Sequence, residues 1–180
     1  MKKMMLKLTF LTLIFLALGI TACKDDKKET EQENITTVVV HLTATDGSLD
    51  QEFEWNDADG PGGNAPDIQP ITLAAGKTYN CHIHVYDRSQ SPAEDITEEI
   101  EEENTEHLFV FAVTGANIQI ADADVDSNGK PFRLETVWTT GAASSGTVNV
   151  VLKHEPDKSA ADPNATGETD FDVTFPVTIQ

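Results

Sequence analysis

Alternation of apolar and polar residues limits what this chain can fold into more than any other feature. In residues 79–85 and 171–179 an apolar side chain stands at every odd position, and most even positions are polar. Successive side chains of a β-strand point to opposite faces, so both stretches are predicted to be strands with one buried face. Cys81 lies on that buried face and is expected to be unreactive.

Shorter runs of β-branched and aromatic residues recur along the chain, separated by turns rich in Gly, Pro and Asp. They predict further strands over residues 35–45, 51–55, 71–73, 107–114, 117–121, 132–139 and 147–153. Residues 94–106 differ, because they are rich in glutamate, follow Ser91-Pro92 and place Ile96 and Ile100 four apart. That pattern favours one short acidic helix. The expected fold of residues 35–180 is all-β, an antiparallel immunoglobulin-like β-sandwich of about eight strands with this helix.

Residues 1–22 have the pattern of a secretory signal peptide that ends at a cysteine. A basic head precedes an apolar run from Leu8 to Ile20, which is too short to span a bilayer. The residues Ile-Thr-Ala before Cys23 resemble the lipobox of bacterial lipoproteins, in which the cysteine is lipidated and becomes the first mature residue. The alternative is cleavage by the ordinary signal peptidase, with Cys23 an incidental neighbour. We expect Cys23 to carry a lipid anchor, since two or three acyl chains hold a protein on a membrane.

The residues after Cys23 refine the expected location. Lys-Asp-Asp at residues 24–26 resembles the short export signal of surface lipoproteins in Bacteroidota-type bacteria, although plain linker chemistry is the other interpretation. Residues 23–34 as a whole are predicted to be a lipidated cysteine and a flexible charged stalk. The expected location is the outer membrane, with the domain lipid-anchored and facing the cell surface.

The charge of the chain excludes one class of partner. There are 31 acidic residues against 12 basic ones, and the formal net charge is −19. Such a surface repels the phosphates of nucleic acids and attracts cations. No nucleophile elbow, phosphate-binding glycine loop, zinc-protease motif or CxxC pair occurs in the sequence, so an enzyme is not predicted.

Histidine spacing suggests a transition-metal site. His82 and His84 stand two apart on one strand face, so that two imidazoles can reach one ion. On a continued helix, residues 99, 103 and 107 would share a face and supply carboxylate and imidazole groups. If helix and strand pack together, the ligands would be His82, His84, Glu103 and His107. The alternative is a polar strand face and a solvated helix, and His41 and His154 are predicted to be isolated surface or loop histidines.

Residues 124–135 have the spacing of a calcium-binding loop, with oxygen ligands at positions 1, 3, 5 and 12 and glycine at position 6. The ligands would be Asp124, Asp126, Asn128 and Glu135. Strands are expected on both sides, which rejects an EF-hand proper. A calcium loop inserted in a β-hairpin and a plain Asp/Asn/Gly turn both remain open. A second acidic loop with Asp57 and Asp59 offers the same ligand types with weaker spacing, and a solvated loop is its alternative.

With these motifs assembled, residues 35–180 resemble a family of small surface lipoproteins from flavobacteria-like genomes. Its members carry a Trp-Asn-Asp-x-Asp-Gly loop, an acidic helix ending in Glu-His, an Asp-Ser-Asn-Gly turn and a His-Glu-Pro-Asp-Lys-Ser segment. The matching residues here are 55–60, 96–107, 126–129 and 154–159. The family is often labelled "type 1 periplasmic binding fold", which implies two α/β lobes and disagrees with the strand pattern. The resemblance implies a role beside TonB-dependent outer-membrane receptors.

Two hypotheses for the function follow. The first is a surface-exposed outer-membrane lipoprotein that binds cations, such as Zn²⁺ or another transition metal, or a metal complex, as an accessory to TonB-dependent uptake. The second is a non-catalytic adhesion or interaction β-sandwich whose loops are stiffened by Ca²⁺.

Overall fold

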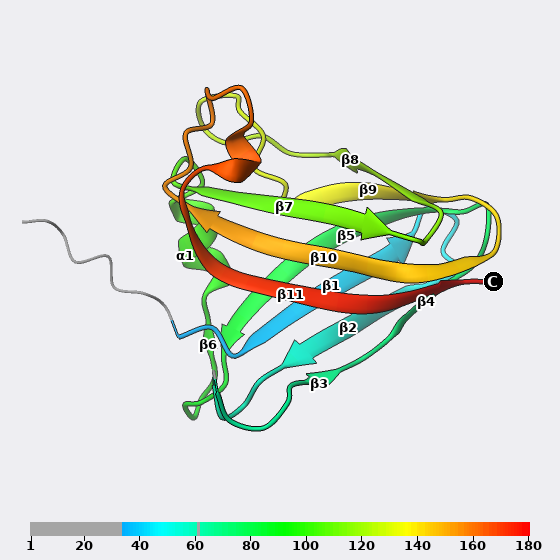
Figure 1. Ribbon diagram of the computed structural model, residues 1–180, viewed down its shortest axis with the longest axis horizontal. Coiled ribbons are helices and arrows are strands. Elements are labelled where there is room, and N and C mark those ends of the chain that lie inside the picture. The colour runs from blue at the N-terminus through cyan, green and yellow to red at the C-terminus, as the bar shows by residue number, and fades with distance from the viewer. Residues whose placement is uncertain (1–33, 61) are drawn as a thin grey trace, which may run out of the picture. The chain divides into compact units, whose positions relative to one another are not determined.

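The computed structural model describes residues 34–60 and 62–180, which form two β-sheets packed face to face (Figure 1). The all-β sandwich predicted from the sequence is confirmed. The predicted signal peptide, Cys23 and nearly all of the predicted stalk lie outside the described residues.

The larger sheet has seven strands, and its order is β3-β2-β1-β5-β9-β8, with β6 paired to the end of β5. All of its pairs are antiparallel. The strands are β1 (Thr37–Ala44), β2 (Asp50–Asn56), β3 (Asp67–Ile68), β5 (Thr78–Asp87), β6 (Glu94–Asp95), β8 (Ile118–Asp122) and β9 (Glu135–Thr140). This sheet places β1 between β2 and β5, three strands that carry most of the polar residues discussed below.

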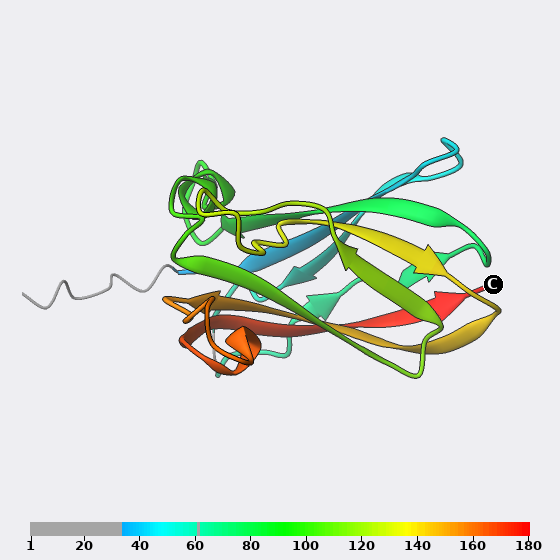
Figure 2. The same ribbon diagram turned by 90° about the horizontal axis from the view of Figure 1, so that it is seen from above.

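The smaller sheet has four strands in the order β4-β11-β10-β7. They are β4 (Ile71–Leu73), β7 (His107–Thr114), β10 (Ser144–His154) and β11 (Glu168–Ile179). β4 runs parallel to β11, whereas the other pairs are antiparallel. The two sheets form separate layers when the molecule is seen from above (Figure 2).

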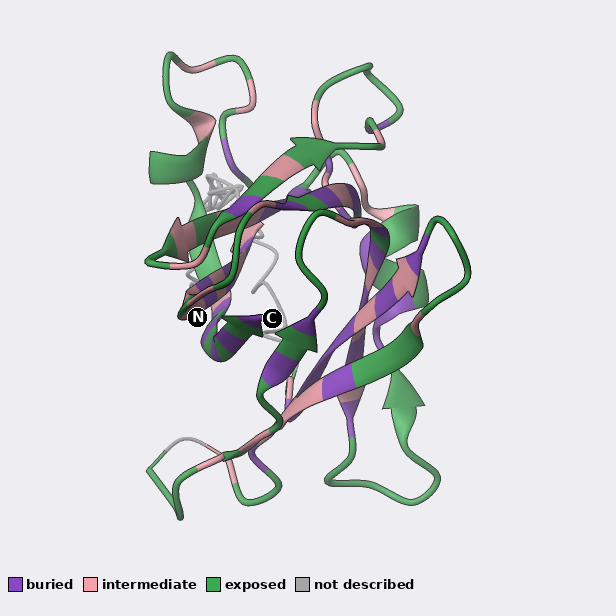
Figure 3. Cartoon of the chain, turned by 90° about the vertical axis from the view of Figure 1, so that its right-hand side faces the viewer, coloured by how far each residue is buried: buried purple, intermediate pink, exposed green. Residues whose placement is uncertain are grey.

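The core lies between the sheets and follows the two-residue period of the sequence. The odd-numbered residues of β5 and β11 from Tyr79 to Val85 and from Phe171 to Ile179 are buried, as predicted. Buried and exposed residues alternate along the strands in Figure 3. Burial raises the pKa of the Cys81 thiol to about 12, so this cysteine stays protonated and unreactive.

The acidic helix is shorter than the sequence predicts. α1 spans Thr97–Glu102, because Glu94 and Asp95 pair with β5 as strand β6 instead of opening the helix. The side chain of Asp95 accepts the amide proton of Thr97, whose hydroxyl lies 2.9 Å from the amide nitrogen of Val85. These contacts fix the start of α1 against β5. Within the described residues, no helix is long and apolar enough to cross a membrane.

One predicted strand begins later than expected. The sequence predicts residues 132–139, whereas β9 starts at Glu135. Arg133 adopts a φ of 66°, a left-handed conformation that interrupts an extended strand. The carboxylate of Asp124 accepts the amide protons of Arg133 and Glu135 and holds this bend in place.

Three connections meet at one end of the sandwich, which we call the loop end. They are residues 103–106 after α1, residues 123–134 between β8 and β9, and residues 155–167, which contain the short helix η1 (Pro163–Ala165). The ammonium group of Lys158 lies 2.6 Å from the carbonyl oxygen of Asn104 and 2.9 Å from the carboxylate of Asp126. Lys158 therefore ties all three connections together.

Candidate metal-binding site

The outer face of the seven-stranded sheet carries a row of metal-ligand residues that crosses four strands. Glu52 on β2 lies opposite His41 on β1, His41 lies opposite His82 on β5, and His82 lies opposite Glu135 on β9. His84 follows on β5 and points to the same face as His82. These five residues come from four separate segments of the chain, and we call them the histidine face.

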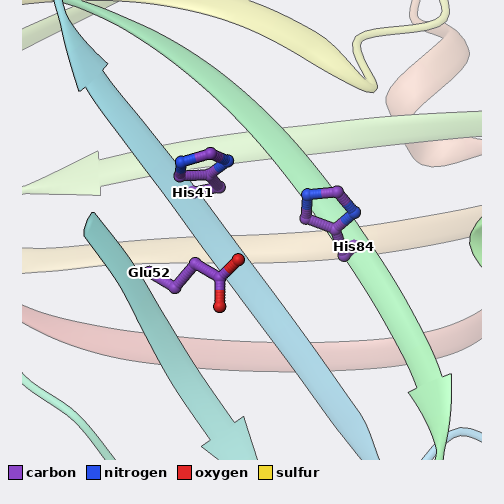
Figure 4. Close-up of side chains that lie close together, drawn as sticks. All are labelled: His41, Glu52 and His84. Atoms are coloured by element: carbon purple, nitrogen blue, oxygen red, sulfur yellow. The ribbon is translucent and has the colours of Figure 1, made fainter. Parts of the chain in front are cut away.

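Three members of the histidine face come close enough to share an ion. One ligand atom each of His41, Glu52 and His84 lies within 4.8 Å of the other two. Figure 4 shows the three side chains on the same side of the sheet, one from each of three neighbouring strands. The ring of His82 is next to them, 4.5 Å from the ring of His84 between centroids.

Carboxylates at the edge of this group can orient the imidazoles. Nε2 of His41 lies 2.7 Å from Oδ1 of Asp50, so Nδ1 is the nitrogen of His41 that remains for another ligand. Nδ1 of His82 lies 3.6 Å from Oε1 of Glu135. A metal-binding imidazole commonly places its other nitrogen against a carboxylate, which fixes the orientation of the ring.

The electrostatics of His84 suit metal binding. Burial lowers its pKa, and the neighbouring rings of His82 and His41 lower it further, although Glu52 opposes the shift. A lowered pKa keeps the imidazole neutral near pH 7, and the neutral form is the one that binds a metal. His41 and His84 are half-buried and Glu52 is exposed, so a bound ion would keep coordination positions open to solvent.

An open depression of about 440 Å³ adjoins the group on the same face. Its walls include His41, His82, Asn80 and Glu135. A depression with two imidazoles and a carboxylate in its walls has room for a ligand larger than a bare ion.

The predicted transition-metal set is brought together only in part. His82 and His84 share a face as expected, but Glu103 and His107 do not join them. His107 begins β7 in the other sheet, where it is buried beside His154. The prediction of His82, His84, Glu103 and His107 as one site is therefore wrong, because α1 ends at Glu102 and the next strand pairs with β10 instead of extending the helix face.

The sequence analysis missed His41 and Glu52, and its prediction of His41 as an isolated histidine is wrong. The odd position of His41 in β1, out of phase with the buried Val38, Val40 and Leu42, indicates an outward side chain. The pairing of β1 with β2 and β5 brings Glu52 and His84 next to His41, and the local sequence pattern does not reveal that pairing.

The carboxylates of the predicted calcium loop are engaged by other partners in this structure. Asp126 is buried. It accepts hydrogen bonds from the backbone amides of Asn128 and Lys130 and from the ammonium group of Lys158. Asp124 is used by the backbone bend before β9, and Glu135 points toward His82. Among the described residues, these three carboxylates form no group within ligand distance of one another. Lys158 supplies a positive charge to the buried carboxylate of Asp126, and calcium binding by residues 124–135 stays a prediction.

The second acidic loop brings Asp57 and Asp59 close to each other, and cation binding there stays a prediction. The carboxylate of Asp59 accepts hydrogen bonds from the backbone amide and the side-chain amide of Asn64. Asp57 is buried, and its Oδ1 has no hydrogen-bond partner in the described chain. Neither aspartate belongs to a three-residue group of possible metal ligands in the part of the chain that is described.

Comparison with models of known protein families, with curated proteins and with solved structures gives no match for this chain. The resemblance to flavobacterial surface lipoproteins therefore stays a prediction from the sequence motifs.

Proposed function

We propose that this domain captures a divalent transition-metal ion, or a complex that carries one, on the histidine face. The observation that supports the proposal most directly is the convergence of His41, Glu52 and His84 within 4.8 Å. Imidazole and carboxylate ligands together suit Zn²⁺, Cu²⁺, Ni²⁺ and Fe²⁺, whereas Ca²⁺ prefers a larger set of oxygen ligands.

The character of the site supports capture and release over permanent storage. Three partly exposed ligands leave positions for water or for a chelating molecule, unlike the closed four-ligand sites that stabilise folds. The net charge of −19 raises the local concentration of cations around the domain. A lipid on Cys23 would hold the domain at the outer membrane, where it could pass its cargo to a TonB-dependent receptor.

The metal site is tested by replacing His41 and His84, the two histidines of the three-residue group. The full chain is purified in detergent without a histidine tag. His41→Ala combined with His84→Ala is expected to weaken Zn²⁺ or Ni²⁺ binding at this site by about 100-fold, since two of three ligands are lost. Isothermal titration calorimetry gives the affinity and the number of ions bound.

Thr139→Ala is the matched control, because Thr139 is exposed on the outer face of β9 in the same sheet, lies outside the depression and offers no strong metal ligand. It should leave the affinity unchanged. An affinity unaltered in the double histidine variant would reject the histidine face as the metal site.

The anchor is tested separately by Cys23→Ser. Without the thiol no lipid is attached, so the chain should move from the membrane fraction to the soluble fraction of the envelope. Fractionation and immunoblotting measure the distribution, with Cys81→Ser as the control, since that cysteine is buried in the core. A Cys23→Ser chain that stays with the membrane would contradict lipid anchoring at this residue.

A further inference from the structure

A second cluster of metal-ligand residues lies at the loop end, in the four-stranded sheet. His107, the first residue of β7, is directly opposite His154, the last residue of β10, and the two rings stack at 4.9 Å between centroids. Asp170 on β11 faces both rings. One ligand atom from each of the three residues lies within 4.8 Å of the other two.

A β-bulge places Asp170 beside the histidines. Leu152 pairs with Phe171 and Lys153 pairs with Thr169, so Asp170 is the extra residue of the bulge. Bulges re-aim a side chain and occur often at functional sites. Without the bulge, the alternation of β11 would send Asp170 to the face opposite Phe171 and away from the core.

The hydrogen bonding of His107 points a lone pair toward Asp170. Its Nδ1 lies 3.2 Å from the carbonyl oxygen of Glu103, which can only accept, so Nδ1 carries the proton. Nε2 of the neutral ring is then a lone-pair acceptor, and it faces Oδ2 of Asp170 at 3.9 Å. That carboxylate oxygen is buried and has no hydrogen-bond partner within the described residues. Two buried acceptors, an imidazole nitrogen and a carboxylate oxygen, therefore face each other, and this arrangement favours a cation between them.

The distances match shared coordination better than direct hydrogen bonding. Nε2 of His107 and Nδ1 of His154 lie 3.9 and 3.8 Å from separate oxygens of Asp170, which is too far for hydrogen bonds. Ligands around a tetrahedral Zn²⁺ are separated by about 3.4 Å, so small side-chain rotations would bring all three onto one ion. A metal-binding histidine commonly donates the proton of its other ring nitrogen to a backbone carbonyl, as Nδ1 of His107 does to Glu103.

The ligand residues of this cluster are buried, which favours a counter-charge beside them. The side chain of His107 is 3% exposed, and that of Asp170 is 13% exposed. Burial lowers the pKa of His107 and raises the pKa of Asp170, so the surroundings disfavour the charged form of each residue on its own. A divalent cation would supply the missing positive charge.

We propose that His107, His154 and Asp170 form a buried site for Zn²⁺ or a similar divalent transition metal that joins the ends of β7, β10 and β11. Exposed Glu106 and Glu155 also lie within 4.8 Å of a ligand atom of His154 and provide an acidic route from solvent. The site is independent of the histidine face, which lies on the other sheet. Because this site is buried, it suits an ion that stabilises the fold. The exposed histidine face, in contrast, suits an ion that is captured and released.

The test measures the melting temperature of the full chain with and without Zn²⁺, in the His41→Ala, His84→Ala background that removes the exposed site. An excess of about 100 times the dissociation constant should raise Tm by roughly 5 to 10 °C, because only the folded state binds the ion. Asp170→Asn keeps the shape of the side chain and should abolish most of this rise. Asp172→Asn, two residues further along β11 on the solvent side, should leave it intact.

His154→Gln provides a second variant, since His154 is less buried than His107 and its loss threatens folding less. Circular dichroism confirms the fold of each variant, and Co²⁺ in place of Zn²⁺ reports tetrahedral nitrogen and oxygen ligands by its visible absorption. The alternative is a bound water that donates to both acceptors, in which case Zn²⁺ should not raise the Tm. No Zn²⁺-dependent rise in Tm, or an equal rise in Asp170→Asn and His154→Gln, would overturn the proposal. If the histidine face binds no metal, Zn²⁺ should still raise the Tm through the site of His107, His154 and Asp170.

Discussion

Replacing Lys158 with methionine is expected to lower the free energy of unfolding by about 3 to 5 kcal/mol, the usual cost of breaking a buried ion pair by removing one partner. The ammonium group lies 2.9 Å from Oδ2 of Asp126, and the two side chains are 7% and 1% exposed. Methionine fills a similar volume but leaves the carboxylate buried without its counter-charge. Chemical denaturation followed by circular dichroism measures the loss.

The pH dependence of stability provides an independent check on the same pair. Burial alone would raise the pKa of Asp126, but the amides of Lys130 and Asn128 and the charge of Lys158 together lower it below 3.8. A lowered pKa means that the contribution of Asp126 is present above pH 3.8 and is lost as the pH falls through the folded-state value. In Lys158→Met the stability should therefore depend less on pH in this acidic range.

Lys130→Met is the matched control, because Lys130 is in the same loop with an exposed side chain and keeps its backbone contact to Asp126. It should change the stability by less than about 0.5 kcal/mol.

The same samples test the calcium interpretation of residues 124–135. A rise in Tm of the unmodified protein with Ca²⁺ would contradict a loop held by Lys158.

Trp138→Ala is expected to cost about 3 to 5 kcal/mol of stability, since it removes the largest fully buried side chain of the core. Trp138 is 0% exposed, packs edge-on against Phe111 at 6.2 Å and donates its indole proton to the hydroxyl of Thr136. Alanine would leave a cavity between the sheets and a buried hydroxyl without this donor. The midpoint of urea unfolding reports the change.

Val125→Ala is the control for this prediction, because Val125 is 64% exposed and its truncation removes little buried surface. Its unfolding midpoint should stay within the error of the parent protein. A Trp138→Ala protein as stable as Val125→Ala would mean that β9 does not pack into the core as described.

The local sequence pattern was sufficient to predict the layers of this fold. Side chains alternate across any strand, so the residues of β5 and β11 reveal their buried faces without knowledge of neighbouring strands. The pattern failed where a contact from elsewhere overrode it. The helix lost residues 94 and 95 to pairing with β5, and the strand before Glu135 was interrupted by the bend at Arg133.

The local pattern of residues is enough to predict a β-sandwich, the burial of Cys81 and the shared outer face of His82 and His84. The folded chain is needed to see that His84 lies beside His41 and Glu52 and that His107 lies beside His154 and Asp170. The physical reason is that the face of a residue depends on its position within one strand, whereas its neighbours depend on the register between strands. That register is set by the packing of the whole core and, at Asp170, by a bulge that shifts it by one residue.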